Sequence, residues 1–176
     1  MTTNSSTSST ARTSGPGPTF REEVRVFDLE AVRALVVETG FFNAEEIGIA
    51  VELVQEHLAK GPTSGYEFVF AEHQGRLIGY ACYGAIAGTR ESHDLYWIVV
   101  HPSEQGKGFG RVLLRETEAR IHQMGGRRVY VETSSRSQYD PTRAFYERCA
   151  YQKAAVLTDF YAPGDGKVIY VKVLPP

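Results

Sequence analysis

The stretch that decides the fold is residues 95–111, LYWIVVHPSEQGKGFGR. An apolar run typical of a buried strand ends at His101-Pro102, a glycine-rich turn follows over 105–110, and an amphipathic helix is expected from there. Backbone N–H groups at such a junction point at one position, and the helix dipole favours an anion there. Because three glycines at alternate positions let a bulky anion approach the backbone, the stretch predicts a phosphate or pyrophosphate site.

The spacing of these glycines separates three kinds of phosphate-binding loop. A Walker loop needs a glycine five residues before Gly106-Lys107 and a Ser or Thr after it, and the chain has neither. A dinucleotide fingerprint needs Gly-x-Gly-x-x-Gly, and its third glycine would fall on Arg111. The pattern Gln105-x-x-Gly108-x-Gly110 remains. It predicts a loop that holds a pyrophosphate on backbone amides, and a structural turn with spare glycines is the alternative.

Length and composition are those of a single folded domain. The chain has 176 residues, 42% of them hydrophobic, and a net charge of −2 argues against a nucleic-acid partner. No apolar run approaches the ~20 residues that span a bilayer, so we expect no membrane association. Cys82 and Cys149 show neither paired nor metal-ligand spacing. We therefore expect no metal and a cytoplasmic location; the sequence leaves the oligomeric state open, with a homodimer as one option.

Residues 1–19 differ in composition from the rest of the chain. They are rich in Ser, Thr, Gly and Pro and carry one charged side chain, Arg12. Such a segment cannot bury enough apolar surface to offset the entropy lost on ordering, so we expect a disordered tail. The folded domain is expected to cover residues 20–176.

Local signals predict the order of the helices and strands. Asp28 is expected to cap a helix that Gly40 ends, and residues 43–46 form a capping-box pattern that starts a second helix. Asp140-Pro141 starts a short last helix. Strands are expected at 22–27, 66–72, 77–83, 94–100, 128–133, 152–161 and 167–174, with a helix at 111–124 and a loop over 84–93. The order β-α-α-β-β-β-α-β-α-β-β predicts an α/β protein with a mixed sheet and helices on both faces.

This order and three motifs resemble the GCN5-related N-acetyltransferase (GNAT) family over residues 20–176. The motifs lie at residues 97–111, 129–133 and 144–151. The last, AFYERCAY, is similar to the family's Phe-Tyr-x-x-x-Gly-Phe, with Ala150 in place of Gly and Tyr151 in place of Phe. Since alanine adopts a left-handed conformation poorly, Ala150 puts the geometry after this helix in question. The resemblance implies the GNAT acyl-CoA N-acyltransferase fold.

The resemblance also implies a cofactor, acetyl-CoA (coenzyme A), and the residues that hold it. Amides of the loop would contact the pyrophosphate, while Lys107 and Arg111 would either add charge or form a solvated pair at the helix start. The family parts its two central parallel strands, which would free backbone groups for the pantetheine arm, and an N–H at or near Val99 would polarise the thioester carbonyl. The cofactor-binding residues expected on this basis are Ile98, Val99, Val100, Gln105, Gly106, Lys107, Gly108, Phe109, Gly110, Arg111, Thr133 and Tyr146.

The resemblance implies a catalytic set of Tyr146, Asp94 and the Val99 amide. Tyr146 takes the position of the acid that returns a proton to the coenzyme A thiolate, the alternative being an aromatic residue packed on the sheet. Asp94 takes the position where histone-acetylating relatives carry a catalytic Glu. Its shorter side chain favours action through a water, and an ordinary strand-start carboxylate is the alternative. Glu132 is a second candidate base and Glu91 a third.

The acceptor is expected to be a small-molecule amine, which would attack acetyl-CoA directly in a ternary complex. Acidic and aromatic side chains together suit an amine, because the carboxylates balance its charge and the rings cover its carbon atoms. The expected substrate-binding residues are Phe41, Phe42, Asp94, Glu132 and Tyr161.

Three other functions stay open at this point. The same fold could acetylate a protein N-terminus or a lysine side chain, or it could bind acyl-CoA without turnover. A nucleotide-dependent oxidoreductase finds support in Glu132, which lies 22 residues after Gly110, near the distance of a ribose-binding acid. The absent third glycine and the late position of the loop in the chain count against this last function.

Overall fold

The computed structural model describes residues 17–176, so residues 1–16 of the expected tail lie outside the described residues. The elements follow the predicted order, and the α/β class with a mixed sheet is confirmed. The strands and α-helices are β1 (Thr19–Arg21), α1 (Asp28–Glu38), α2 (Ala44–Lys60), β2 (Glu67–His73), β3 (Arg76–Ala85), β4 (Ser92–Val100), α3 (Phe109–Gln123), β5 (Arg128–Ser134), α4 (Asp140–Arg148), β6 (Gln152–Ala162) and β7 (Asp165–Val173). Thr19, expected in the tail, is the first residue of β1.

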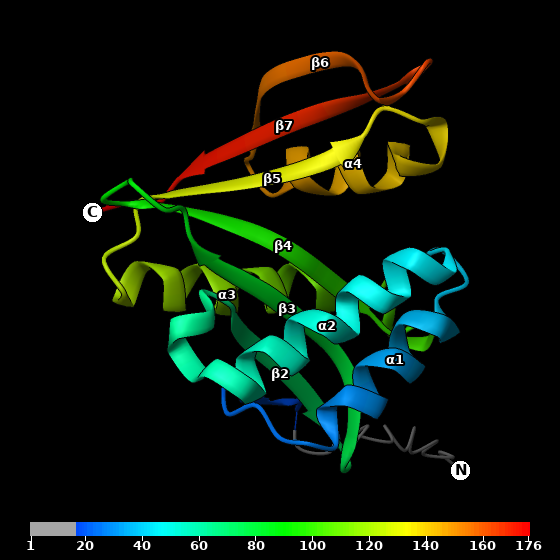
Figure 1. The fold of residues 1–176 in the computed structure, drawn as a ribbon, viewed down its shortest axis with the longest axis vertical. Helices are drawn as coiled ribbons and strands as arrows, with labels where there is room; N and C mark the ends of the chain where they lie inside the picture. Colours follow the sequence, from blue (N-terminus) through cyan, green and yellow to red (C-terminus); the bar gives the residue numbers. More distant parts are fainter. Residues whose placement is uncertain (1–16) are drawn as a thin grey trace, which may run out of the picture.

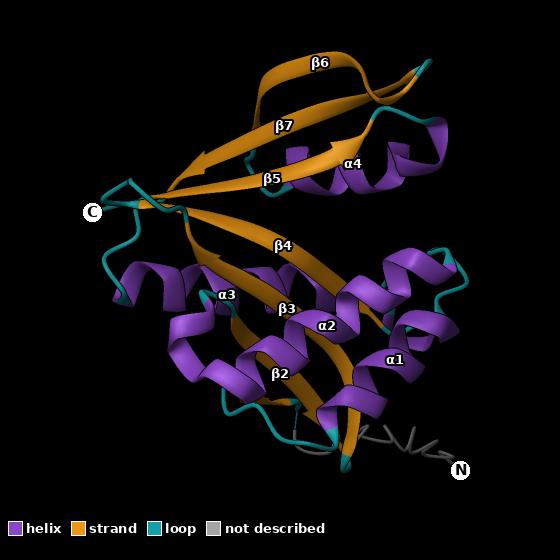
Figure 2. Cartoon of the chain, in the orientation of Figure 1, coloured by secondary structure: helices purple, strands orange, loops and turns teal. Residues whose placement is uncertain are grey.

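One sheet organises the molecule and carries helices on both faces (Figure 1). Its seven strands run in the order β1-β2-β3-β4-β5-β7-β6, and every neighbouring pair is antiparallel except β4 with β5. Figure 2 shows α1 and α2 over one face, where Val36 and Val54 pack with Phe68 and Tyr80 of the sheet. On the other face, buried residues of α3 and α4 form a second hydrophobic cluster with the sheet.

The start of α2 agrees with the capping box predicted from the sequence. The Asn43 side chain accepts a hydrogen bond from the Glu46 N–H at 2.9 Å, and the Glu46 carboxylate accepts one from the Asn43 N–H at 2.8 Å. Two N–H groups that the first helical turn leaves without a partner are thereby satisfied. The helix ends before Gly61, whose φ of +59° favours glycine.

The first strand lies three residues earlier than the sequence indicates. The strand expected at 22–27 is wrong, because this segment is a loop in which Val26 is 74% exposed. The Arg21 guanidinium donates to Asp28 at 2.8 Å and to Glu72 at 2.7 Å. These bonds tie β1 both to β2 and to the first turn of α1, so the segment between them has to turn away from the sheet.

The loop expected over 84–93 is shorter in the structure, because β3 and β4 extend into it. Gly84 pairs with Asp94 there, and a side chain at Gly84 would collide with the Gly65 carbonyl oxygen. The longer strands place Asp94 inside β4 rather than at its first residue.

The chain after α4 keeps a left-handed residue although alanine stands in the place of glycine. Ala150 has a φ of +68°. The next N–H, that of Tyr151, donates to the Tyr146 carbonyl at 3.0 Å, and the Tyr151 side chain is only 3% exposed. Burial of this ring therefore holds Ala150 in a conformation that costs a residue with a side chain roughly 1–2 kcal/mol.

Replacing Ala150 with glycine should raise the free energy of unfolding by about 1 kcal/mol, because glycine adopts this φ without strain. Urea unfolding of the purified variant measures the change. Ala144→Gly, inside α4, is the matched control and should lower stability by about 1 kcal/mol. Equal losses in both variants would show that Ala150 is not strained.

Candidate active site

The two parallel strands of the sheet separate within their length. β4 pairs with β5 through three residue pairs, of which Asp94 with Tyr130 is the last. Beyond this pair the strands diverge, as Figure 1 shows. Tyr96 has no partner in β3, and this bulge bends β4 near the point where it leaves β5. The sheet therefore contains a gap in which backbone groups of β4 and β5 do not pair with each other.

The register with β3 determines which backbone groups of β4 face this gap. The His101 N–H donates to the Ile78 carbonyl of β3 at 2.9 Å. Because successive backbone groups along a strand point in opposite directions, Val99 also faces β3, while Ile98 and Val100 face the gap. The N–H available there is thus that of Ile98 or Val100, rather than the Val99 amide expected from the sequence.

The glycine-rich loop follows β4 through a short 3-10 helix, η2 (Pro102–Glu104). Gly106 and Gly108 have φ values of +74° and +81°, which favour glycine. Within the part of the chain that the structure describes, the N–H groups of residues 106–110 find no backbone acceptor outside α3. They gather at the N-terminus of α3, an arrangement typical of an anion site.

The side chains of the loop differ in what they contact. Gln105 donates from Nε2 to the Val100 carbonyl at 2.9 Å, which fastens the loop to the end of β4. Lys107 is exposed and pairs with Glu104 at 3.3 Å. Arg111 is exposed and forms no ion pair with any of residues 17–176.

The other wall of the gap comes from β5 and α4. Phe109 packs against the core, and a Cβ placed on Gly110 would stand 3.4 Å from the Phe145 ring, so the loop lies directly beside α4. Thr133 Oγ1 in β5 is buried and has no hydrogen-bond partner among the described residues. A buried hydroxyl in this state is free to bond a water or a ligand.

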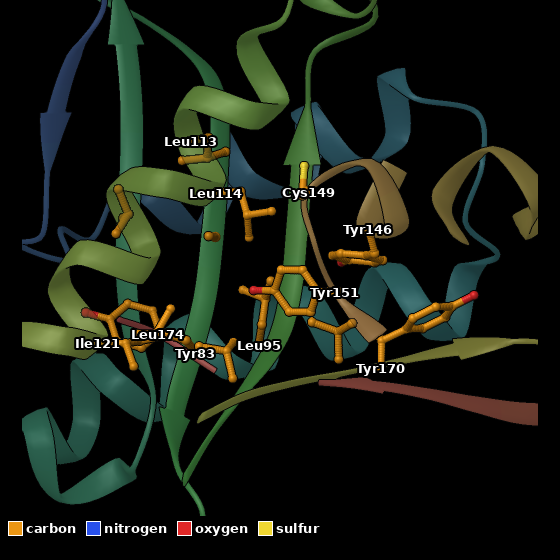
Figure 3. Close-up of a cluster of buried hydrophobic side chains, with 14 of the residues drawn as sticks. Tyr83, Leu95, Leu113, Leu114, Ile121, Tyr146, Cys149, Tyr151, Tyr170 and Leu174 are labelled. Atoms are coloured by element: carbon orange, nitrogen blue, oxygen red, sulfur yellow. The ribbon is translucent and has the colours of Figure 1, made fainter. Parts of the chain in front are cut away.

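Tyr146 lies in the hydrophobic cluster between α4 and the sheet. Its ring centroid is 5.4 Å from that of Tyr151 and 6.3 Å from that of Tyr170, and Figure 3 shows these three residues close together. Burial raises the pKa of the Tyr146 hydroxyl, so the phenol keeps its proton throughout the neutral range. The position is compatible with both roles expected from the sequence, packing on the sheet and donation of a proton.

Asp94 and Glu132 lie toward the opposite face, that of α1 and α2. Leu95 belongs to the cluster beneath α3, so Asp94 before it points the other way. Burial first, and then the charge of Glu132, raise the pKa of the Asp94 carboxyl, while Lys167 opposes the shift. The Lys167 ammonium pairs with Glu132 at 2.5 Å and lies 3.9 Å from the centre of the Phe160 ring.

Aromatic rings border the same face. The Phe41 ring centroid is 5.1 Å from Phe42 and 4.9 Å from Tyr139. The pKa of Tyr161 is raised by burial and then by the charge of Glu132. Of the expected acceptor residues, Phe41 and Phe42 contact each other, while Asp94, Glu132 and Tyr161 are coupled through their charges.

Three further residues of this side are not among those expected from the sequence: Tyr139, Phe160 and Lys167. Tyr139 ends a short 3-10 helix just before α4, and no spacing in the sequence marks it for this side. Lys167 carries no local signal either, because its approach to Glu132 depends on the pairing of β5 with β7.

No group of three or more His, Cys, Asp or Glu side chains within residues 17–176 is arranged to hold a metal ion. In the same part of the chain, every helix is too short or too polar to cross a membrane.

Comparison with known proteins gives consistent results. The model of the "Acetyltransferase (GNAT) family" matches residues 30–151. N-alpha-acetyltransferase RimI of Mycobacterium tuberculosis is 32% identical over 95 residues, which are 53% of this chain and 57% of that protein. A crystal structure assigned to the GNAT family, from Desulfovibrio desulfuricans, is 46% identical with a TM-score of 0.87, over 89% of this chain and 99% of the other. An aminoglycoside 6'-N-acetyltransferase complexed with coenzyme A has a TM-score of 0.71 at 18% identity, over 90% of this chain and 98% of the other, and shares the fold.

The geometry predicts how Asp94 titrates. Its carboxyl should titrate above the usual value of about 3.9 for aspartate, because burial and Glu132 disfavour its charge. Glu132→Gln should lower this pKa by removing a like charge, and Lys167→Met should raise it by removing an opposite one. Carboxyl-resolved NMR titration measures each value.

Glu91→Gln is the matched control and should leave the Asp94 titration unchanged, because the Glu91 carboxylate faces Arg128 at 3.8 Å. An ordinary Asp94 pKa, or a rise in Glu132→Gln, would show that these groups do not form one cluster.

Proposed function

The chain belongs to the GNAT family of acetyltransferases, and we propose that it transfers the acetyl group of acetyl-CoA to a primary amine of a small molecule. The amine attacks the thioester directly, in a ternary complex that holds both substrates. One observation carries the proposal: the pairing of β4 with β5 ends at Asp94, and the loop of free amides follows the same strand. The gap between β4 and β5, which suits the extended pantetheine arm, thus adjoins the loop, which suits a diphosphate.

The residues present fit coenzyme A. The free N–H groups of residues 106–110 and the positive end of the α3 dipole suit the diphosphate. Ile98 and Val100 can pair with the amide groups of the pantetheine arm as an edge strand pairs with an added strand. Thr133 Oγ1 is a further buried polar atom that has no hydrogen-bond partner among the described residues. When bound, acetyl-CoA supplies an acyl carbon activated by its bond to sulfur.

Two groups of the chain would stabilise charge as the amine attacks. An N–H of Ile98 or Val100 donates to the carbonyl oxygen as negative charge gathers there, and it is held in place beforehand by the pairing of β4 with β3. Tyr146 keeps its proton because burial raises its pKa, and it donates that proton where negative charge develops on the leaving sulfur.

Asp94 is the base in this proposal. The amine arrives as an ammonium ion and has to lose a proton before it attacks. The raised pKa of Asp94 makes it a better proton acceptor near neutral pH than an ordinary aspartate would be. Its short side chain favours acceptance of the proton through a water. Glu132, which forms an ion pair with Lys167, is the second candidate base.

The contacts of Lys167 support an amine as the acceptor. Its ammonium already lies against the Glu132 carboxylate and the Phe160 ring, so this side of the gap accommodates one cationic nitrogen. Asp94 adds a second carboxylate beside it. The Phe41 and Tyr139 rings, 4.9 Å apart, offer apolar surface for the carbon atoms of a small acceptor.

A protein N-terminal amine is the second candidate acceptor. The relative from Mycobacterium tuberculosis that is 32% identical over 95 residues is an N-alpha-acetyltransferase. Among protein acceptors, this favours an N-terminal amine over a lysine side chain. The choice between the two is one of acceptor size, since both present a primary amine.

The proposal predicts thiol release from acetyl-CoA when a small primary amine is added, at a higher rate than with a peptide that has a free N-terminus. Tyr146→Phe should lower turnover about 100-fold, because it removes the proton donor, and should change the affinity for acetyl-CoA little. A thiol-trapping dye follows the rate, and calorimetry gives the affinity.

Tyr151→Phe is the matched control, because it removes a neighbouring buried hydroxyl that has no part in the proposed mechanism, and it should leave turnover unchanged. A higher rate with peptides would favour the second acceptor class. Tight binding without turnover on any amine would make the chain a non-catalytic acyl-CoA-binding domain, and full turnover in Tyr146→Phe would remove this residue from the mechanism.

A further inference from the structure

The ammonium group of Lys167 is enclosed by one carboxylate and two aromatic rings. Its nitrogen lies 2.5 Å from a Glu132 oxygen, 3.9 Å from the centre of the Phe160 ring and 5.7 Å from that of the Tyr161 ring. The two rings meet edge to face, with their centroids 5.0 Å apart. Aromatic rings and a carboxylate around one nitrogen are typical of a binding site for an organic cation. We call Glu132, Phe160 and Tyr161 the cation cage.

An irregularity in β6 builds this cage. The pairing of β6 with β7 breaks between Leu157 and Ala162, so residues 158–161 of β6 oppose only Gly166 of β7. The stretch bends out from β7, and Figure 1 shows β6 standing away from its neighbour over part of its length. It thereby carries both rings of the cage over the side chain of Lys167.

Lys167 fills the cage from β7. Glu132 of β5 pairs with Ile169, so Lys167, two residues earlier, is its diagonal neighbour on the same face of the sheet. These contacts leave the Lys167 side chain 14% exposed, whereas the Glu132 side chain is 46% exposed and both rings are half-exposed. The cage is therefore open to solvent, and the side chain of Lys167 occupies its centre.

The chain neutralises the carboxylates at the cage and leaves that of Asp94 without a cation. Lys167 pairs with Glu132, and Arg136 pairs with the Asp165 carboxylate at 3.1 Å. Asp94, whose pKa is raised by burial and then by Glu132 and lowered by Lys167, forms no ion pair within residues 17–176. One free carboxylate balances one ammonium group, and a second ammonium group on the acceptor would meet the like charge of Lys167.

We propose that Lys167 determines which amines the protein accepts, because it fills a cation cage on this side of the gap and so restricts the acceptor to amines without a second positive charge. The inference rests on the proposed function, since it takes this side of the gap as the acceptor site. The reacting amine then lies at Asp94, and the rest of the acceptor is neutral or anionic where it passes the cage. Without Lys167 the cage is a second cation site, and a diamine can use both.

NMR titration of the full-length protein with 1-aminobutane and with 1,4-diaminobutane tests the inference, because the two ligands have the same length and differ by one ammonium group. The unaltered protein should bind the diamine no more tightly than the monoamine. In Lys167→Ala the diamine should gain roughly tenfold in affinity relative to the monoamine, because an ion pair and a cation–π contact become available to it. The pair 1-aminohexane and 1,6-diaminohexane covers a longer separation of the two cation sites.

Three further variants separate the cage from the effect of charge alone. Lys167→Arg keeps the positive charge and should behave as the unaltered protein does. Lys167→Met removes the charge but still fills the cage, so the gain of the diamine should stay well below that in Lys167→Ala. Lys153→Ala, which removes an exposed lysine of β6 outside the cage, should leave the ratio of the two affinities unchanged.

The outcomes separate this inference from the proposed function. A preference of the unaltered protein for either diamine would overturn the inference, as would the absence of a gain in Lys167→Ala at both chain lengths. Equal gains in Lys167→Ala and Lys167→Met would also overturn it, because the loss of one charge, and not an empty cage, would then attract the diamine. Thiol release from acetyl-CoA is a separate readout. Its absence with every amine would overturn the proposed function, whereas the titration still decides whether Lys167 fills a cation site.

Discussion

The loss of pairing between β4 and β5 beyond Asp94 is the constraint on which the rest of the structure depends. A strand in the middle of a sheet normally has partners on both sides, and backbone N–H and C=O groups without partners are costly when buried. Here the gap is stabilised by its surroundings. The bulge at Tyr96 bends β4, and the Gln105 side chain donates a hydrogen bond to the Val100 carbonyl. The antiparallel pairs with β3 hold the strand in place. The chain thus maintains an incomplete sheet that an extended ligand can complete.

The two faces of the sheet provide different environments on either side of this gap. The face of α3 and α4 carries the free amides and the exposed side chains of Arg111, Arg115 and Arg148, which together form a positive surface. The face of α1 and α2 carries Asp94, Glu132 and aromatic rings, which suit a cation. An anionic cofactor and a cationic acceptor would therefore approach from opposite sides and meet between the strands. In the proposed mechanism Tyr146 and Asp94, one on each side, would give and accept a proton.

Features encoded by neighbouring residues could be predicted from the sequence. The capping box at Asn43, the loop after β4 and the order of all the elements depend on spacings of a few residues. Features that depend on distant pairings could not. The position of β1 follows from the bonds of Arg21 to Glu72. The register with β3 decides that Ile98 and Val100, and not Val99, face the gap. The cavity of about 210 Å³ lined by Arg111, Arg148 and Lys172 combines three segments that no local pattern connects.

The alternation of backbone groups along β4 provides the most direct test of the central claim. Amide hydrogen exchange followed by NMR, with and without acetyl-CoA, reports on each N–H separately. The account predicts slower exchange for Ile98, Val100 and the loop amides 106–110 when acetyl-CoA binds, and little change for Val99, whose N–H is already paired with β3. Exchange that stays fast at Ile98, Val100 and the loop in the presence of bound acetyl-CoA would contradict it, because the cofactor would then lie outside the gap.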